Sequence, residues 1–284
     1  MLKVTRRRFL KHLGVLTGTA VLAGGYTIFI EPYWVQVVKR PLPIQNLPKS
    51  LQGKTLLQIS DIHVGNNFSW EYLIRELQQA QSLNADIVVY TGDFVSFEDE
   101  EQYAQLQEVI KHAPLGKLGT FGVTGNHDFG EHWADIGVSD QVCGIIEGHG
   151  IQMLRNEVTA VDGLKIGGIE DYWSPLFDPI PVTIQFAPDE PSLILCHNPD
   201  ACDEPVWGEF NGWTLAGHTH GGQIRPPFFK APVVPTKNRD YTSGEFDLGN
   251  GRKLYINRAL GHYIPIRFNV RPEITLFTMV KEAS

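Results

Sequence analysis

The feature that most constrains the fold is a repeated order in which a short apolar run ends in a polar cluster and a helical pattern follows. The apolar runs at residues 55–59, 87–90 and 120–123 have the length and composition of buried β-strands. Apolar residues at helical spacing follow at 70–83 and 100–112. Strands that alternate with helices predict parallel pairing in an α/β fold.

The second half of the chain is richer in strand and has few long helical patterns. Its candidate strands are residues 164–169, 192–196, 213–216, 253–256 and 274–279. We therefore predict an α/β fold of two packed mixed β-sheets flanked by helices.

Polar clusters follow five of the predicted strands. In chain order they are Asp61-x-His63, Gly92-Asp93, Gly125-Asn126-His127-Asp128, His197 and Gly217-His218-Thr219-His220. In α/β sheets, ligands collect beyond the carboxyl ends of the strands, so these side chains are expected to meet there. If the segments are extended, alternation places both residues of each Asp-x-His or His-x-His pair on one face.

The amino terminus has the pattern of a targeting signal. Residues 5–11, Thr-Arg-Arg-Arg-Phe-Leu-Lys, precede an uncharged and mostly apolar run at 13–30. This pattern resembles a twin-arginine export signal, and an ordinary membrane anchor with positive flanking charge is the alternative. Residues 1–31 are thus predicted to engage the twin-arginine export machinery or a membrane.

Export would place the protein in the periplasm or on the outer face of the cytoplasmic membrane. The small residues around Ala23 and Gly24 would tolerate cleavage, whereas the uncut run at 13–30 is just long enough to span a bilayer. Membrane association therefore stays open at this point, as does the oligomeric state.

The rest of the chain divides into two parts. Residues 32–53, which contain Pro41, Pro43 and Pro48, are predicted to be a connector, and residues 54–284 a single domain. The leader contains five of the 24 basic residues and none of the 32 acidic ones before Glu31, so the remainder is strongly acidic. We therefore expect no nucleic-acid-binding surface.

The three cysteines, Cys143, Cys196 and Cys202, are too few and too irregularly placed for a disulfide framework or a thiolate metal site. We expect small buried apolar residues, although Cys196 and Cys202 are near enough in sequence for a pair.

Taken together, the ordered clusters resemble the calcineurin-like metallophosphoesterase superfamily over residues 61 to 220. The resemblance implies a four-layer sandwich with two divalent metal ions, of manganese, iron or zinc. Asp93 corresponds to the carboxylate that bridges the two ions. The other implied ligands are Asp61, His63 and His220 for one ion, and Asn126, His197 and His218 for the other.

The resemblance also implies a mechanism, in which a metal-bridging hydroxide attacks phosphorus in line. His127 matches the family's histidine that is not a ligand and would stabilise or protonate the departing oxygen. Asp128 would orient His127. The remaining histidines are expected to be ordinary: His12, His112, His132, His149 and His262.

Two positions differ from the motifs of well-known branches of this superfamily and thereby exclude those branches. Ser96 stands where purple acid phosphatases carry a metal-binding tyrosine, and Asp128 stands where protein serine/threonine phosphatases carry glutamate. The chain is most similar to small bacterial members with a twin-arginine leader, through Glu31-Pro32-Tyr33-Trp34, His197-Asn198-Pro199-Asp200 and the segment 217–223, Gly-His-Thr-His-Gly-Gly-Gln.

That branch implies an exported phosphodiesterase acting on a phosphate ester. The alternatives are a UDP-2,3-diacylglucosamine-type pyrophosphate hydrolase with a lipid-linked substrate, as in lipid A biosynthesis, and a metal-stabilised binding module without turnover. Arg225 and Arg258 are the candidates for substrate binding. Arg225 begins a Pro-Pro-Phe-Phe segment that could form an apolar lip or a stiffened loop on the core.

Overall fold

The computed structural model describes residues 5–65, 69–97, 99–262 and 264–282, so residues 1–4 of the predicted leader lie outside the described part. Two six-stranded sheets form its centre. The first has the order β1 (Gln36–Ile44), β12 (Glu273–Lys281), β2 (Thr55–Ile59), β3 (Ile87–Thr91), β4 (Gly119–Val123), β5 (Gln152–Met153). The second has the order β10 (Gly244–Gly249), β11 (Arg252–Ile256), β9 (Trp213–Ala216), β8 (Ser192–Cys196), β7 (Leu164–Ile169), β6 (Glu157–Val161).

The predicted fold of two mixed sheets flanked by helices is confirmed. Strands β2 to β5 pair in parallel, and β12 joins them antiparallel to β2. In the second sheet β7, β8, β9 and β11 are parallel, with antiparallel neighbours β6 and β10 at the two edges. The carboxyl ends of both parallel sets point to the same region, which becomes the functional site.

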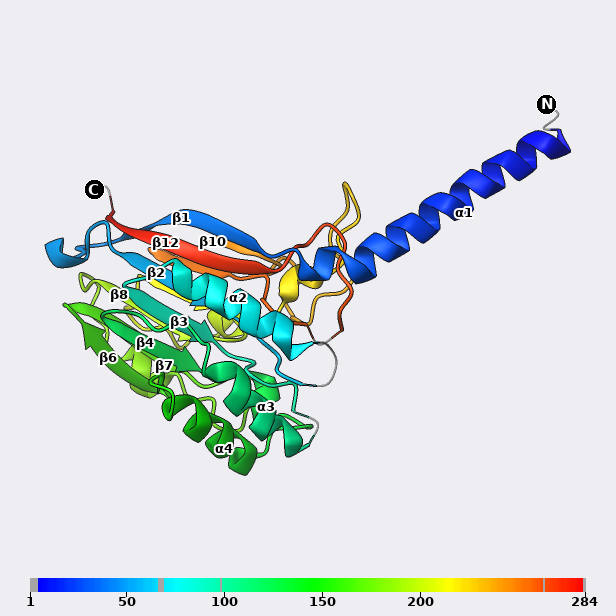
Figure 1. The fold of residues 1–284 in the computed structure, drawn as a ribbon. Helices are drawn as coiled ribbons and strands as arrows, with labels where there is room; N and C mark the ends of the chain where they lie inside the picture. The colour runs from blue at the N-terminus through cyan, green and yellow to red at the C-terminus, as the bar shows by residue number, and fades with distance from the viewer. Residues whose placement is uncertain (1–4, 66–68, 98, 263, 283–284) are drawn as a thin grey trace.

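The central strands of the two sheets are buried on both faces. Side chains such as Leu56, Val89, Leu195 and Phe277 fill the space between the sheets. On the outer face of the first sheet lie α2 (Trp70–Ser82), α3 (Glu101–Ile110) and α4 (Ile136–Glu147) (Figure 1). The second sheet is covered by the short α5 (Ile180–Thr183), the 3-10 helix η4 (Pro199–Asp203) and loops. Burial on both faces explains why the strands read as continuous apolar runs.

Helix α2 shows how the local sequence sets an element. Ser69 caps its amino end, because the side chain accepts a hydrogen bond from the Tyr72 backbone amide at 3.4 Å. Tyr72, Leu73, Leu77 and Ala80 then fall on one buried face at helical spacing. Arg75, Gln78 and Gln79 remain on the solvent side, whereas Glu76 is buried.

The range 32–53 differs from the predicted connector. It contains the nine-residue strand β1, which pairs in parallel with β12 at the edge of the first sheet. Pro41 and Pro43 hid this strand because proline cannot donate a ladder hydrogen bond, a loss that an edge strand tolerates. Helix α4 and strands β5, β6 and β10 were also not predicted.

Helix α1 (Arg6–Phe29) projects from the end of the molecule opposite the carboxyl terminus (Figure 1). Residues 6–33 are long and apolar enough to cross a membrane by length and composition, and α1 itself contains no buried residue. Its base is joined to the domain by the Arg267 backbone amide, which donates to the Thr27 carbonyl at 3.0 Å. Two further short helices follow, η1 (Glu31–Tyr33) and η2 (Lys49–Leu51).

Replacing Phe277 by alanine tests the core between the sheets. Phe277 is 1% exposed and meets the Tyr255 ring edge-to-face at 5.0 Å between centroids. We expect Phe277→Ala to lower the free energy of unfolding by about 3–5 kcal/mol, as measured by urea denaturation. The control Ile184→Ala, at an exposed apolar residue, should change it by less than about 0.5 kcal/mol. Equal stabilities for the two variants would contradict the proposed core.

Candidate metal centre

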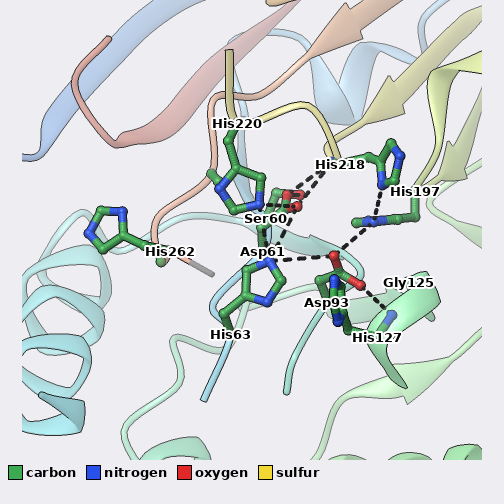
Figure 2. A network of polar contacts seen from close by, with 12 residues as sticks. Ser60, Asp61, His63, Asp93, Gly125, His127, His197, His218, His220 and His262 are labelled. Atoms are coloured by element: carbon green, nitrogen blue, oxygen red, sulfur yellow. Dashed lines mark hydrogen bonds and ion pairs between the residues drawn. The ribbon is translucent and has the colours of Figure 1, made fainter. Parts of the chain in front are cut away.

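The predicted ligands come from two neighbouring groups of strands. Asp61 and His63 follow β2, Asp93 follows β3, and Asn126 follows β4 in the first sheet. His197 follows β8, and His218 and His220 follow β9 in the second sheet. All seven side chains are buried. Figure 2 shows six of them gathered in one place beyond the strand ends, namely Asp61, His63, Asp93, His197, His218 and His220.

The backbone brings them together in a way that differs from the prediction. Asp61, His63, Asp93, His218 and His220 all have positive φ, between 48° and 69°. The expectation that the two pairs lie in extended segments is therefore wrong, because each strand has already ended and the chain turns at the ligand itself. Such a conformation costs about 1–3 kcal/mol per residue and persists only where the surroundings enforce it.

Asp93 lies at the centre of the cluster. Its Oδ2 is 3.1 Å from His197 Nε2 and 3.4 Å from His63 Nε2, so side chains of both sheets face one carboxylate oxygen. Its Oδ1 accepts a hydrogen bond from the His127 backbone amide at 2.9 Å. This position between the two histidines fits the bridging role that the sequence predicts.

The potential ligand atoms form two groups, and Asp93 belongs to the second group while also facing His63 of the first. Asp61, His63 and His220 form one group, with 3.2 Å between Asp61 Oδ1 and His220 Nε2. Asp93, His197 and His218 form the other, with 3.3 Å between His197 Nε2 and His218 Nδ1. Within each group the potential ligand atoms lie within 4.8 Å of one another.

The polar atoms of the cluster fit metal ions. Asn126 Oδ1 is buried without a hydrogen-bond partner, a state that costs about 1–3 kcal/mol unless a cation or donor fills it. Two imidazole nitrogens, His63 Nε2 and His220 Nε2, face each other at 3.0 Å. Mixed carboxylate, imidazole and amide donors around such atoms suit divalent cations.

His127 also belongs to a possible ligand group, with His63 and Asp93. Distances alone therefore do not distinguish it from the ligands. The histidines predicted to be ordinary are absent from the groups found among the described residues. One of them, His262, is buried and accepts a hydrogen bond from Arg267 Nε at 3.0 Å.

Backbone carbonyls orient two of the imidazoles. His197 Nδ1 lies 2.7 Å from the Thr91 carbonyl oxygen, and His218 Nε2 lies 2.9 Å from the Pro235 carbonyl oxygen. Each of these ring nitrogens donates to its carbonyl, so the other nitrogen of each ring faces the cluster and is the one that could bind a cation. Burial opposes the charged form of His197, but Asp93 outweighs it and raises the pKa of His197 well above its usual value, so a cation there would displace a proton from this ring. Neither carbonyl could be found from the sequence, because a backbone acceptor leaves no residue-specific signal.

Ser96 has the corresponding role for His63. Its Oγ is 3.2 Å from His63 Nδ1, on the side of the ring opposite the cluster. Ser96 is buried at the position that distinguishes this chain from the tyrosine-containing phosphatases. From the sequence, Ser96 was notable only because it stands in place of the tyrosine of purple acid phosphatases. In the structure, its hydroxyl contacts the His63 ring.

The charges of the cluster influence one another strongly. Burial opposes ionisation of Asp61, but the nearby His220 and His197 outweigh it and lower its pKa to about 2. Burial similarly opposes ionisation of Asp93, yet His197 and His127 lower its pKa well below the usual value. Burial lowers the pKa of His63, so that this ring is neutral and able to bind a cation.

Asp128 secures the backbone around the cluster. Its Oδ1 accepts hydrogen bonds from the Phe94 and Val95 amides at 2.8 and 3.2 Å, and its Oδ2 accepts one from the Gly125 amide at 2.8 Å. Burial, followed by the charge of Asp93, raises the pKa of Asp128 to about 8. Asp128 thus positions the turn that carries His127, while a direct contact with the imidazole stays a prediction.

A cavity of about 780 Å³ opens above the cluster. His63, His127 and His218 lie on its floor and walls, together with Trp133 and Trp173. The two indole rings stack at 4.8 Å between centroids. Neither tryptophan was predicted to belong to the site, because no sequence motif contains it. Much of the cavity wall is therefore apolar.

The two arginines predicted as substrate-binding candidates lie elsewhere. Neither Arg225 nor Arg258 is among the described residues that line the cavity. The Arg258 guanidinium contacts the Glu273 carboxylate and donates to Gln36 Oε1 at 3.1 Å. The cysteines, by contrast, are as predicted: Cys143, Cys196 and Cys202 are free and buried.

Ser96→Ala tests the orientation of His63. Removing the hydroxyl removes the Nδ1 contact that helps to orient the His63 ring, so we expect metal affinity to fall by about 10- to 100-fold in calorimetric titrations. Ser139→Ala removes a buried serine on α4 and should leave the affinity unchanged. Equal affinities for the two variants would show that Ser96 does not orient the ligand.

Gly125→Ala tests the close approach to Asp93. A methyl group at Gly125 would lie 2.8 Å from the Asp93 carboxyl carbon, so the carboxylate must move and bound metal should fall. Gly144 on α4 has no atom within 4 Å of the same added group. Gly144→Ala should therefore keep its bound metal, with metal content measured by elemental mass spectrometry. Its free energy of unfolding should rise by up to about 1 kcal/mol.

The comparisons with known proteins agree with this geometry. Residues 54–222 match the family model described as calcineurin-like phosphoesterase. The chain is 32% identical to the uncharacterized metallophosphoesterase YkuE of Bacillus subtilis, over 98% of this chain and 99% of that protein. It is 27% identical to the phosphodiesterase YaeI of Escherichia coli, over 98% and 100%.

A further relative is the UDP-2,3-diacylglucosamine pyrophosphatase LpxG of Chlamydia trachomatis, 28% identical over 95% of this chain and 97% of that protein. Both the family match and the full-length similarity cover the strand ends that carry the cluster. The chain therefore belongs to the calcineurin-like metallophosphoesterase family and is a metal-dependent phosphoester hydrolase.

Proposed function

We propose that the protein is an exported phosphodiesterase that works with two divalent cations. The observation that carries the proposal is the pair of carboxylate–histidine groups on either side of Asp93, on the floor of an open cavity. When bound, two such cations would activate a water for in-line attack and neutralise charge on the phosphoryl oxygens. Manganese, iron or zinc suits the donor set.

The chain's own residues supply the rest of the chemistry. Asp93 separates the two cation positions, and the carbonyls behind His197 and His218 keep those imidazoles in the metal-binding tautomer. His127 lines the cavity and would give its proton to the departing oxygen. Asp128 and Asp93 hold the backbone of that histidine in place.

Cleavage of a lipid-linked pyrophosphate is the second candidate function. The apolar walls at Trp133 and Trp173 and the similarity to a UDP-2,3-diacylglucosamine pyrophosphatase favour it. Nucleotide-linked lipid precursors are made on the cytoplasmic side, however, whereas the leader directs the domain outward. A binding module without turnover is disfavoured because His127 remains in the cavity wall.

Export rests on the leader. The motif at residues 5–11 carries the twin-arginine pattern, and the helix that follows is exposed along its length. A folded protein exported in this way would acquire its metals in the cytoplasm before crossing the membrane. Residues 13–30 would either be removed or retain the domain at the outer face.

A substrate panel tests the proposed reaction. Metal-replete full-length protein should hydrolyse bis(p-nitrophenyl) phosphate faster than p-nitrophenyl phosphate or UDP-2,3-diacylglucosamine. Faster turnover of the lipid nucleotide would establish the second candidate, and no turnover of any substrate would favour the binding module. Element analysis of the natively exported protein should find two metal ions per chain.

His127→Ala tests the proposed proton donor. We expect kcat for the diester to fall by about 10²- to 10⁴-fold while the metal content stays at the wild-type level. His149→Ala, which changes a histidine hydrogen-bonded to the Ile145 carbonyl near the end of α4, should leave kcat unchanged. Full activity of the His127 variant with its metals bound would exclude the role.

A further inference from the structure

Exposed apolar side chains gather on two loops at one end of the domain. Phe228 is fully exposed, and Phe229 and Val233 are 72% and 68% exposed on the same loop. Ile264 of a second loop and Ile224 are also exposed. These five residues form what we call the apolar rim, an arrangement that is costly in water unless something covers it.

The apolar rim lies beside the base of α1. Ile224 bridges to Phe268, and the Arg225 amide donates to the Phe268 carbonyl at 2.9 Å. The neighbouring Arg267 amide donates to Thr27 in the last turns of α1 at 3.0 Å. In Figure 1 the yellow-to-orange loop of this region stands next to the point where α1 leaves the domain.

The base of α1 has the residues of a membrane–water boundary. Trp34 is half exposed, and the Arg271 guanidinium lies 3.9 Å from its ring centroid. Tryptophan and arginine are enriched at this depth, where the ring meets the lipid headgroups. If α1 enters a bilayer, its base and therefore the apolar rim lie at the bilayer surface.

The charges around the rim suit the same surroundings. Arg225 and Lys230 flank the two phenylalanines, and the Lys230 ammonium pairs with the exposed Asp240 carboxylate, in a chain with a formal net charge of −8. Apolar side chains that enter the acyl region, with basic residues at the headgroups, are typical of surface-bound membrane proteins. An acidic protein that presents basic and aromatic residues beside its apolar helix is complementary to anionic lipid.

We propose that the apolar rim is a membrane-docking surface, which inserts Phe228 and Phe229 into the bilayer that α1 enters. Ile224, Val233 and Ile264 of the rim also line the cavity above the metal centre. Docking therefore places the mouth of the cavity at the lipid surface, where amphiphilic phosphate esters reach it without crossing water. The docking itself does not depend on the proposed reaction.

Nitroxide labels on single cysteines test the docking. The native cysteines are all buried, so Phe228→Cys, in full-length protein reconstituted into phosphatidylglycerol nanodiscs, accepts the label selectively. We expect collisions with oxygen, which is lipid-soluble, to exceed those with a water-soluble nickel chelate in electron paramagnetic resonance. Leu16→Cys in the middle of α1 should give the same result.

Ile184→Cys is the matched control, because Ile184 is an exposed apolar residue next to α5, which covers the second sheet away from the rim. Its label should collide mainly with nickel. A label at residue 228 that behaves as at residue 184 would overturn the proposal, as would a water-exposed label at residue 16. Dipolar broadening that disappears on dilution with unlabelled protein would instead identify the rim as an interface between copies.

Unchanged thermal unfolding midpoints would verify that the labelled variants are folded, without reference to activity. If the metal-replete wild-type protein did not hydrolyse the diester, the proposed function would be refuted, and the docking result would be unaffected. The two proposals are thus distinguished by separate measurements.

Discussion

The structure depends on the burial of Asp93 between histidines of the two sheets. Its carboxylate faces His63, which follows a strand of the first sheet, and His197, which follows a strand of the second. Histidines from both sheets therefore contact one negative charge. A buried charge is tolerated only when it is paired and hydrogen-bonded, which the surrounding imidazoles and the His127 amide provide. The packing of the two sheets and the geometry of the metal centre are therefore set together.

Much of this arrangement could be predicted from the sequence. Continuous apolar runs identified β2, β3, β4, β8 and β9, because strands buried on both faces leave no polar alternation. The polar residues directly after these runs identified the candidate ligands. Both signals are local, since each requires only a few neighbouring residues.

What the sequence could not show arises from contacts between distant segments. The left-handed backbone of residues such as Asp61 and His220 appears only when two loops pack together. The Thr91 and Pro235 carbonyls that orient the histidines have no side-chain signature. Strand β1 was hidden because Pro41 and Pro43 interrupt its pattern, and its pairing with the distant β12 leaves no local signal.

That pairing has a consequence for the timing of folding. Strand β12 is synthesised last, yet it lies between β1 and β2, which are synthesised first. The first sheet therefore closes only after residues 273–281 have left the ribosome, and until then β1 and β2 lack the strand that lies between them. A leader that engages only folded proteins would thereby export finished chains and leave truncated ones behind.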